Sequence, residues 1–467
     1  MRSKLLLRLY SFTTFFCLVS LSLLRADLNA EGTLPSPPNV LLIVVDTLKT
    51  KNLGCYGADP SPSPNMDQLA RKGAFFKNAF SPAPWTKPSV ASIFTGYYPS
   101  QHKVTSVNSK MNPPYQVMSQ YFKAKDYAAG GIVSHTLISP KTGYSRGFDF
   151  YKMVKFSGNV HDSVTSDQVT DMAIKWLDGN AGKRFFLFLH YFDPHFAYQH
   201  HAEFDRTSSY KGKIPPGLAF RQLRDMIPEM SGADKKYIEG LYDEETAFTD
   251  KHMGRLLKHL EAKGLDKQTL LVLTADHGEE FFEHDWLGHT RTLYNELIHV
   301  PLIFYWPGKV AARTIAENVS TVDILPTFLE LLHGDGSEHL KPLPGLSLLP
   351  SLIGASKPPS DRALFSEVDF KSAGIQAFKL AVVKENFKLV YDKDTLGYEL
   401  YDLVKDPDEK RDLAGSDQAA LSRLKPLLEE YQAALGGKDT ARDQALADQS
   451  EGKTPKEVEQ LKSLGYL

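Results

Sequence analysis

Cysteine is scarce in this sequence, which has only Cys17 and Cys55 among its 467 residues. Cys17 lies in an apolar N-terminal stretch that we expect to be removed, so Cys55 would stand alone and no intrachain disulfide is predicted. Strong charge is also lacking, because the formal net charge is only -2. The charge balance therefore gives no indication of a nucleic-acid partner or of a membrane-surface role.

Long apolar runs are equally rare, and the longest extends from about Leu9 to Leu24 behind the basic residues Arg2, Lys4 and Arg8. This layout, followed by small and polar residues, is typical of a secretory signal peptide, which we place at residues 1–26. The alternative is an uncleaved membrane anchor, since the run is only slightly shorter than a full span. We therefore expect a secreted or periplasmic protein that contacts a membrane only if this segment is retained.

Apolar runs and helical segments alternate through the region 38–357, which we predict to be a catalytic domain. Runs typical of parallel strands buried on both faces lie at 39–45, 185–189, 269–273 and 301–306. Strands that alternate with helices predict an α/β domain with a mostly parallel sheet. Ligands bind beyond the carboxyl ends of such strands. Asp46 and the pair Asp276-His277 lie at these ends.

The sequence pattern changes beyond about Pro358. Two strand-like segments at 378–383 and 386–392 predict a hairpin, a further strand follows at 399–403, and residues 421–435 have helical periodicity. We expect a small antiparallel sheet with one packed helix, forming a C-terminal subdomain over 358–438. Residues 439–467 are predicted to be a mobile tail that ends in a short amphipathic helix.

Thr86 lies near the start of a predicted helix. Pro88 suits the first turn and Gly96 follows the end, so the helix is expected over 87–95. The unpaired N–H groups and the positive end of the helix dipole would hold an anionic ester group and stabilise an alkoxide on Thr86. The alternative is that Thr86 only caps the helix, which is a common role for threonine.

The segment Ser81-Pro-Ala-Pro-Trp-Thr86-Lys-Pro-Ser-Val-Ala-Ser-Ile-Phe-Thr-Gly96 resembles the active-site signature of the sulfatase family, part of the alkaline phosphatase-like superfamily. Thr86 and Val90 stand where the family has its nucleophilic cysteine and an arginine. Sulfatases oxidise that cysteine, or a serine, to formylglycine, but the methyl group on the Cβ of threonine prevents this. The resemblance implies a three-layer alkaline phosphatase-like sandwich. The substitution points to a branch with a threonine nucleophile, so no formylglycine is expected.

The resemblance also implies a metal site. Asp46, Thr86, Asp276 and His277 occupy positions of metal ligands in the family. Formylglycine sulfatases typically have more oxygen ligands, which suit Ca²⁺. Thr47 and His277 replace two of these, and fewer carboxylates with one nitrogen favour a single Zn²⁺ or Mn²⁺. The alternative is that Asp276 and His277 only cap the next element.

Two histidines resemble active-site residues of the family. His195 matches the histidine of an aspartate-proline-histidine segment, and His289 lies where sulfatases have lysine and the threonine branch commonly has histidine. Histidine donates a proton near neutral pH, so both are predicted to protonate the leaving oxygen or to shield charge on the other oxygens. An alternative adds a second metal held by Asp193, His195 and His289.

Further contacts to the substrate are predicted for Lys87, His135 and Arg291. The register of Arg291 with the family's basic position is shifted by one residue. His135 aligns with part of a lysine-x-histidine pair that is not reproduced here. We interpret all three as candidate substrate-binding residues, and their alternative role is structural.

These residues predict an exported, metal-dependent hydrolase that cleaves an ester of a small molecule, glycan or lipid. An ester formed on Thr86 cannot collapse to an aldehyde and must be attacked by water or by another alcohol. Enzymes of the alkaline phosphatase-like superfamily perform that reaction on phosphate, so the sequence favours phosphate esters, and diesters in particular. The alternatives are a sulfuric ester hydrolase resembling arylsulfatases, a phosphoryl head-group transferase and a non-enzymatic binding protein.

Overall fold

The structure is a computed structural model that describes residues 37–154, 164–334, 337–372, 375–435, 454–463 and 466. The chain divides into two units, 1–37 and 38–467, and the elements described below belong to the second. The predicted signal peptide at 1–26 lies outside the described residues, as does most of the tail predicted at 439–467.

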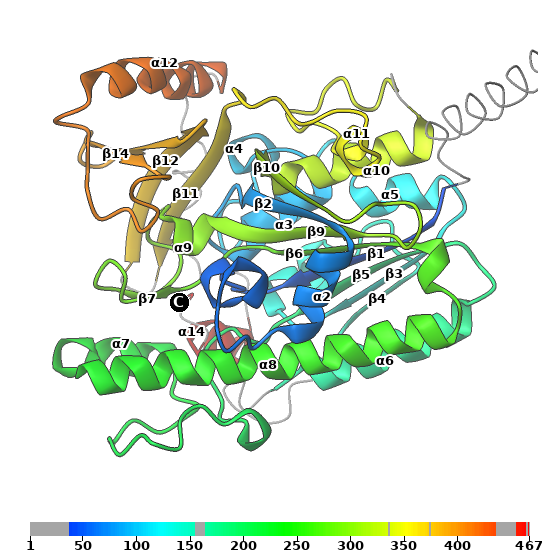
Figure 1. Cartoon of the computed structure of the whole chain (residues 1–467), viewed down its shortest axis with the longest axis horizontal. Helices are drawn as coiled ribbons and strands as arrows, with labels where there is room; N and C mark the ends of the chain where they lie inside the picture. The colour runs from blue at the N-terminus through cyan, green and yellow to red at the C-terminus, as the bar shows by residue number, and fades with distance from the viewer. Residues whose placement is uncertain are drawn as a thin grey trace, which may run out of the picture. The chain divides into compact units, whose positions relative to one another are not determined.

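An eight-stranded sheet forms the centre of the larger unit (Figure 1). In sheet order its strands are β10 (Arg313–Ser320), β2 (Ala74–Phe80), β9 (His299–Tyr305), β6 (Thr269–Ala275), β1 (Asn39–Val45), β5 (Phe185–Tyr191), β3 (Ala128–Val133) and β4 (Phe150–Met153). β9 runs antiparallel to both of its neighbours, and the other pairs are parallel. The predicted α/β fold with a large, mostly parallel sheet is confirmed.

Helices cover both faces of this sheet and give the predicted three layers (Figure 1). The group α2, α6 and α8 packs together on one face, and α3, α5 and α10 pack together on the other. The helices are α2 (Pro64–Lys72), α3 (Thr86–Thr95), α4 (Pro99–His102), α5 (Met118–Lys123), α6 (Ser166–Asn180), α7 (Phe220–Met226), α8 (Gly232–Ala262), α9 (Asn295–Ile298), α10 (Ile324–His333), α11 (Leu349–Leu352), α12 (Gln418–Ala434) and α14 (Pro455–Ser463).

The central strand, β1, positions the edge at which the candidate site lies. All seven of its residues are buried, and each fully buried aliphatic side chain contributes about 1.5–3 kcal/mol to folding. β1 runs parallel to β5 and β6 on its two sides. The carboxyl ends of these three strands therefore meet at one edge of the sheet.

A four-stranded antiparallel sheet forms the predicted C-terminal subdomain. Its strands are β11 (Leu364–Ser372), β12 (Ile375–Lys384), β13 (Phe387–Asp392) and β14 (Tyr398–Asp402), and the short strands β7 (Glu280–Phe281) and β8 (Leu287–Gly288) form a separate pair. α12 packs on β12 and β13 through Leu424 and Leu428. β11 was not predicted because the polar residues Ser366, Glu367 and Asp369, although buried, interrupt its apolar pattern.

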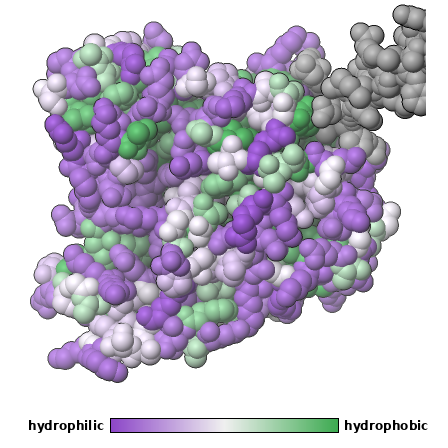
Figure 2. All heavy atoms as spheres, viewed as in Figure 1, coloured by the Kyte–Doolittle hydropathy of each residue, from purple (hydrophilic) through white to green (hydrophobic). Residues whose placement is uncertain are grey.

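The face of the protein in Figure 2 is mainly hydrophilic, with hydrophobic residues in small separate areas. Among the described residues, the large hydrophobic side chains that are exposed are Met226, Leu346, Leu396 and Val404. None of the helices in the described part of the chain combines the length and the apolar character needed to cross a membrane.

A buried ion pair joins the end of the main domain to the chain that leads into the C-terminal subdomain. The two terminal guanidinium nitrogens of Arg362 each lie 2.7 Å from a carboxylate oxygen of Asp323, which is fully buried. Asp323 also accepts hydrogen bonds from the backbone N–H groups of Ser320 and Leu346. The family-like segment around Asp323 therefore has a structural role in this chain.

Replacing Arg362 by leucine is expected to lower the free energy of unfolding by about 3 kcal/mol, because a buried carboxylate loses its charged partner. Urea denaturation measures the change. Lys341→Ala is the control, since its ion pair with Glu338 is exposed and such pairs contribute about 1 kcal/mol or less. Equal effects of the two substitutions would contradict the structural role of the buried pair.

Candidate active site

The carboxylate of Asp46 directly follows β1, and a tight turn places it. The next residue, Thr47, has a backbone φ of 52°, a left-handed conformation that is unfavourable for a β-branched residue. The hydroxyl of Tyr242, from α8, holds this turn by donating to the carbonyl of Thr47 and accepting from the N–H of Lys49, both at 2.8 Å. Asp46 itself is fully buried.

Thr86 is the first residue of α3, and Trp85 occupies the N-cap position without a side-chain capping bond. The hydroxyl of Thr86 is directed towards the strand ends, with its Oγ1 atom 3.5 Å from Asp46 Oδ1 and 3.3 Å from His277 Nε2. The structure therefore gives no support to a simple capping role. Ser89 fixes the helix against β6, because its hydroxyl donates to the carbonyl of Asp276 at 2.6 Å.

The four predicted metal ligands converge. His277 Nε2 lies 3.4 Å from Asp46 Oδ1 and 3.8 Å from Asp276 Oδ2. Ligand atoms around a tetrahedral Zn²⁺, with bonds of about 2.0 Å, are separated by about 3.3 Å. All four side chains are fully buried. The structure thus brings together Asp46, Thr86, Asp276 and His277 at separations that a small divalent ion could bridge.

Hydrogen bonding in this group fits a metal ion. His277 Nδ1 lies 2.8 Å from the carbonyl of Gly278, so its N–H donates there and Nε2 keeps its lone pair for a ligand bond. The Oδ2 atoms of Asp46 and Asp276 have no hydrogen-bond partner within the described residues. Because unpaired buried carboxylate oxygens are costly, a cation is the chemical partner that this arrangement suits.

Charge in the group is unbalanced without a cation. Burial raises the pKa of Asp46 well above its ordinary value, and the carboxylates of Asp276 and Glu279 raise it further. Burial also raises the pKa of Asp276, but His277 and His190 outweigh this effect and the net pKa is lowered. Burial lowers the pKa of His277 to about 4, so the imidazole is neutral and able to bind a metal.

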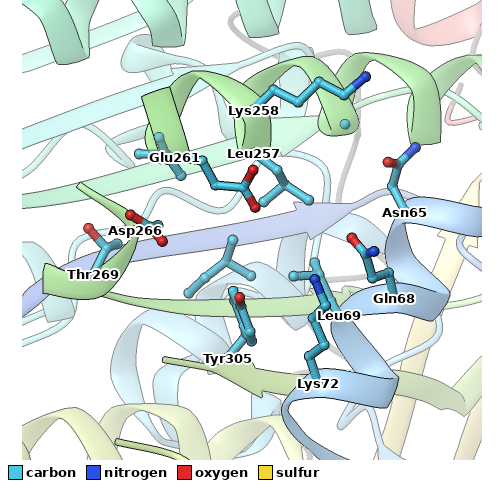
Figure 3. A pocket seen from close by; sticks show the side chains of 13 residues that line it. Asn65, Gln68, Leu69, Lys72, Leu257, Lys258, Glu261, Asp266, Thr269 and Tyr305 are labelled. Carbon is cyan, nitrogen blue, oxygen red and sulfur yellow. The ribbon is translucent and has the colours of Figure 1, made fainter. Parts of the chain in front are cut away.

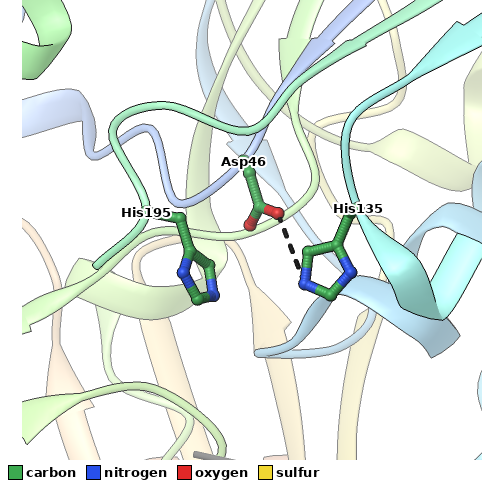
Figure 4. A group of neighbouring side chains, drawn as sticks. All are labelled: Asp46, His135 and His195. Carbon is green, nitrogen blue, oxygen red and sulfur yellow. Dashed lines mark ion pairs between the residues drawn. The ribbon is translucent and has the colours of Figure 1, made fainter. Parts of the chain in front are cut away.

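A second set of histidines surrounds the other oxygen of Asp46. The side chains of His135 and His195 approach Asp46 from separate segments (Figure 4), and His135 Nε2 lies 3.9 Å from Asp46 Oδ2. The Nε2 atoms of both histidines have no hydrogen-bond partner within the described residues. Burial lowers the pKa of each well below its ordinary value. His135 Nδ1 accepts from the N–H of Leu137, so its Nε2–H can donate to an oxygen of an anionic group. His195 Nδ1 lies 2.8 Å from the carbonyl of Phe196, so its Nε2 keeps a lone pair that can bind a metal or accept a proton.

His190 was not predicted as a site residue. It lies within β5 and is fully buried. Its Nε2 atom is 3.8 Å from Asp46 Oδ2 and 3.6 Å from Asp276 Oδ2, and neither ring nitrogen has a hydrogen-bond partner in the described part of the chain. A polar residue inside an otherwise apolar strand was the available signal in the sequence.

His289 belongs to a hydrogen-bonded chain at the same site. Its Nδ1 atom lies 2.8 Å from Glu279 Oε1, and its Nε2 atom lies 3.1 Å from the hydroxyl of Tyr466. The hydroxyl of Tyr198 donates to the other oxygen of Glu279 at 3.1 Å. Burial raises the pKa of Glu279 to about 8 and lowers the pKa of His289 to about 3. These shifts favour the uncharged form of both groups near neutral pH.

Tyr466 also reaches the predicted nucleophile, since its hydroxyl oxygen lies 3.4 Å from Thr86 Oγ1. Burial, with a smaller effect of Asp46, raises the pKa of Tyr466 well above its ordinary value, so the phenol keeps its proton. This position was predicted to belong to the tail, and its place in the site was not predicted.

Three predicted residues have other surroundings. The ammonium group of Lys87 is buried and donates to the carbonyl of Val107 at 2.6 Å. Arg291 is exposed, and its guanidinium lies over the ring of Trp286, 4.5 Å from the centroid, so it is not part of the buried cluster.

Asp193 accepts hydrogen bonds from the backbone N–H groups at 165 and 166, at the start of α6. The alternative of a second metal held by Asp193, His195 and His289 would require this carboxylate to share these hydrogen bonds with an ion, and it stays a prediction.

Replacing Asp193 by alanine is expected to lower the free energy of unfolding by about 1–2 kcal/mol, because two N–H groups at the start of α6 lose their acceptor. Metal content should not change, since the carboxylate is engaged away from the metal-ligand group. Thermal denaturation and elemental analysis of the same samples test both statements. Loss of bound metal in the folded variant would restore Asp193 as a ligand.

Another acidic and histidine-containing group lies close by, formed by Glu280, His284 and Glu296. Both ring nitrogens of His284 already have partners there, namely Glu296 Oε1 at 2.6 Å and the carbonyl of Glu409 at 3.2 Å. Glu280 Oε2 has no hydrogen-bond partner within the described residues, but the histidine of this group has no nitrogen left for a metal ion.

A pocket between α2 and α8 lies at the other end of β6 (Figure 3). It is lined by Lys72, Lys258 and Glu261, among others, and by Thr269 at the first position of β6. Asp276 follows the last position of the same strand, which places it roughly 20 Å away at the usual rise per residue. The pocket is therefore separate from the candidate active site.

Two models of known protein families match this chain. The family model described as Sulfatase matches residues 38–334. A second model, described as N-sulphoglucosamine sulphohydrolase, C-terminal, matches residues 282–434. The first of these covers more than half of the chain, including every residue of the predicted metal site.

Individual relatives cover nearly the whole chain. The N-acetylglucosamine-6-O-sulfatase of Bacteroides thetaiotaomicron is 24% identical over 487 residues, covering 85% of this chain and 86% of the relative. The structure of BT4656 in complex with its substrate D-glucosamine-2-N,6-O-disulfate matches with a TM-score of 0.69 at 22% identity, covering 87% of this chain and 99% of that one. The phosphonate monoester hydrolase of Agrobacterium radiobacter matches with a TM-score of 0.69 at 21% identity, covering 86% and 95%.

Proposed function

Because the chain belongs to the sulfatase family, we propose that it is an ester hydrolase in which Thr86 attacks the tetrahedral sulfur or phosphorus of an anionic ester directly. The observation that carries this proposal is the position of Thr86 Oγ1, 3.5 Å from Asp46 Oδ1 and 3.3 Å from His277 Nε2 at the start of α3. Ester hydrolysis follows from the membership of this chain in the sulfatase family. The identity of the nucleophile is our inference from the residues.

Asp46, Asp276 and His277, together with Thr86, would hold one divalent ion, and one nitrogen among few carboxylates favours Zn²⁺ or Mn²⁺ over Ca²⁺. Such an ion supplies charge stabilisation for the transferred group and favours the alkoxide of the nucleophile. The backbone N–H groups at the start of α3 hold the anionic oxygens of the ester. The Nε2–H of His135 donates to the same oxygens, because His135 Nδ1 accepts from the N–H of Leu137. His195 uses its Nδ1–H for the carbonyl of Phe196 and keeps a lone pair on Nε2.

The reaction has two stages. In the first, the Oγ1 atom of Thr86 forms a bond to sulfur or phosphorus, and the bond to the alcohol oxygen breaks. In the second, water attacks the same atom and releases the acid from Thr86. Since threonine cannot form the aldehyde of formylglycine, the second stage requires this attack, and it proceeds without modification of residue 86.

Sulfate esters of glycans are the substrate class that the relatives favour. Most of the curated relatives are named as sulfatases, and BT4656 was solved with a sulfated glucosamine. This support reverses the order predicted from the sequence, in which phosphate esters came first. The buried, largely neutral histidines suit a group with a single negative charge, such as a sulfate monoester.

Phosphate or phosphonate esters are the second candidate class. Thr86 favours them, because hydrolysis of a threonine ester by attack of water is the usual second stage in phosphate chemistry of this superfamily. The phosphonate monoester hydrolase of Agrobacterium radiobacter shares the fold of this chain. A head-group transferase would use the same first stage and would then transfer the phosphoryl group from Thr86 to an alcohol acceptor in place of water.

A panel of aryl esters distinguishes these classes. The purified protein, loaded in turn with Zn²⁺, Mn²⁺ or Ca²⁺, is assayed with aryl sulfate, phosphate monoester, phosphate diester and phosphonate, and with sulfated glucosamine. We expect the highest kcat/KM with a sulfate ester and with Zn²⁺ or Mn²⁺. A preference for the phosphorus esters would establish the second candidate, and transfer to added glycerol in place of water would establish the transferase. Turnover of none of these esters would refute the proposed hydrolase.

We also propose that the protein is exported, on the basis of the basic and apolar residues at its N-terminus. N-terminal sequencing of the protein recovered from a secreting host should give a first residue near position 27. Recovery of the intact N-terminus in a membrane fraction would contradict cleavage and support the anchor.

A further inference from the structure

Tyr466 lies between the predicted nucleophile and His289. Its hydroxyl oxygen is 3.4 Å from Thr86 Oγ1 and 3.1 Å from His289 Nε2. His289 continues through its Nδ1 atom to Glu279, 2.8 Å away. One hydroxyl group thus joins Thr86 to the histidine–glutamate pair by hydrogen bonds. The ring of His277 also lies beside that of His289, with 4.6 Å between centroids, but within the described residues it makes no hydrogen bond to it.

The position of Tyr466 is built into the fold. The backbone N–H of Tyr466 donates to the carbonyl of Leu461, in α14, at 2.8 Å. Leu461 and Tyr466 are both buried in a hydrophobic cluster that includes Trp85 and Phe370. The ring of Tyr466 lies 6.1 Å from the ring of Trp85, the residue that precedes Thr86. The aromatic ring is therefore held by packing, independently of its hydroxyl group.

Attack by Thr86 requires that its proton leave a site closed to solvent. Thr86 is fully buried, and Tyr466 and His289 are 1% and 3% exposed. A hydroxyl group can accept one hydrogen bond while it donates another. Tyr466 can thus accept from Thr86 and donate to His289 Nε2, when the Nδ1–H of His289 donates to Glu279. Among the described side chains that are hydrogen-bonded to Thr86, Tyr466 is the one that is also hydrogen-bonded to His289.

We propose that Tyr466 is a catalytic residue that passes the proton of Thr86 to His289. As Oγ1 forms its bond to sulfur or phosphorus, the Thr86 proton moves to the oxygen of Tyr466, and the proton of Tyr466 moves to Nε2 of His289. The bond to the leaving oxygen breaks with its electron pair, and the leaving oxygen then takes the proton from His289. Because Tyr466 gains one proton and loses another, it is a neutral phenol both before and after the transfer. This proposal rests on the proposed function, because it assigns the proton path of that reaction.

Tyr466→Phe tests the proposal, since it removes the hydroxyl and keeps the ring that packs against Trp85 and Phe370. We expect kcat to fall by about 10²–10³-fold, the usual contribution of a positioned proton-transfer group. KM and the melting temperature should remain within error of the unsubstituted protein. Tyr305→Phe is the matched control, because Tyr305 lines the distant pocket. It should leave kcat unchanged.

Removal of residues 454–467 is the second variant and should lower kcat at least as much as Tyr466→Phe. Unchanged kcat in Tyr466→Phe would overturn the proton path. A higher kcat/KM after truncation would overturn it in another way, by showing that the C-terminal segment only obstructs the site. Thr86→Ala, assayed in parallel, separates the two proposals. If Thr86→Ala remains active, the proposed function fails; if it is inactive while Tyr466→Phe is fully active, only the role of Tyr466 fails.

Discussion

Replacing Thr86 by alanine is expected to lower kcat on the order of 10⁴-fold or more, because loss of a nucleophile removes the first bond-forming stage. The folded structure should persist, since the hydroxyl of Thr86 makes three long hydrogen bonds within the described part of the chain, to Asp46, His277 and Tyr466. Initial rates with the best ester of the panel measure the effect. Circular dichroism and the melting temperature verify that the variant is folded.

Thr86→Ser is the matched variant for this prediction. It keeps the hydroxyl and should retain most of the activity, whereas alanine should not. Mass spectrometry of the peptide that contains residue 86 of the unsubstituted protein gives a second readout. The mass should be that of unmodified threonine in the resting enzyme, with added mass of a sulfuryl or phosphoryl group after rapid quenching. Full activity of Thr86→Ala would contradict the role of Thr86 and would indicate that a water molecule attacks the ester directly.

Removal of divalent metal is the second change with a large expected effect. A chelator should abolish turnover, because the unpaired oxygens of Asp46 and Asp276 and the open Nε2 of His277 would lose the charge that balances them. The unfolding free energy should also fall, by about 2.7 kcal/mol relative to a metal concentration one hundred times Kd. Enzyme assays and thermal denaturation, before and after dialysis against a chelator and after return of each metal, measure both.

The location of the metal is tested by a pair of histidine substitutions. His277→Ala should lose bound metal in elemental analysis. His284→Ala should keep it, because both ring nitrogens of His284 already have hydrogen-bond partners. If His284→Ala released the metal and His277→Ala retained it, the ion would belong to the Glu280 group and not to the Asp46 group.

The part of the site that follows strand ends was predictable from the sequence. Asp46 and Asp276 directly follow buried apolar runs, and parallel strands bring their carboxyl ends to one edge. Their convergence therefore required only that β1 and β6 be neighbours, which the structure shows. Thr86 was predictable for a different reason, since the proline and glycine signals that bound its helix are local.

The remainder depended on packing that no local pattern encodes. His190 was not predicted because it lies in a seven-residue apolar strand, and the residues of such strands usually belong to the hydrophobic core. Its neighbours in the sequence do not indicate that its ring lies close to two carboxylates. Tyr466 lies 380 positions from Thr86 along the chain, a contact that only the docking of α14 produces. The hydrogen bonds of the Asp193 carboxylate to the N-terminus of α6 were not predicted, because its proximity to His195 in the sequence does not reveal them.

The order of strands around β1 has a consequence for how the protein folds. Residue 39 of β1 pairs with residue 269 of β6, and residue 40 pairs with residue 186 of β5. Such distant pairings require large loops to close before any contact stabilises them, which slows folding. The three strand ends that carry Asp46, His190 and Asp276 can meet only after both closures. Refolding should therefore regain helical content early, and the capacity to bind metal should return in its last and slowest phase.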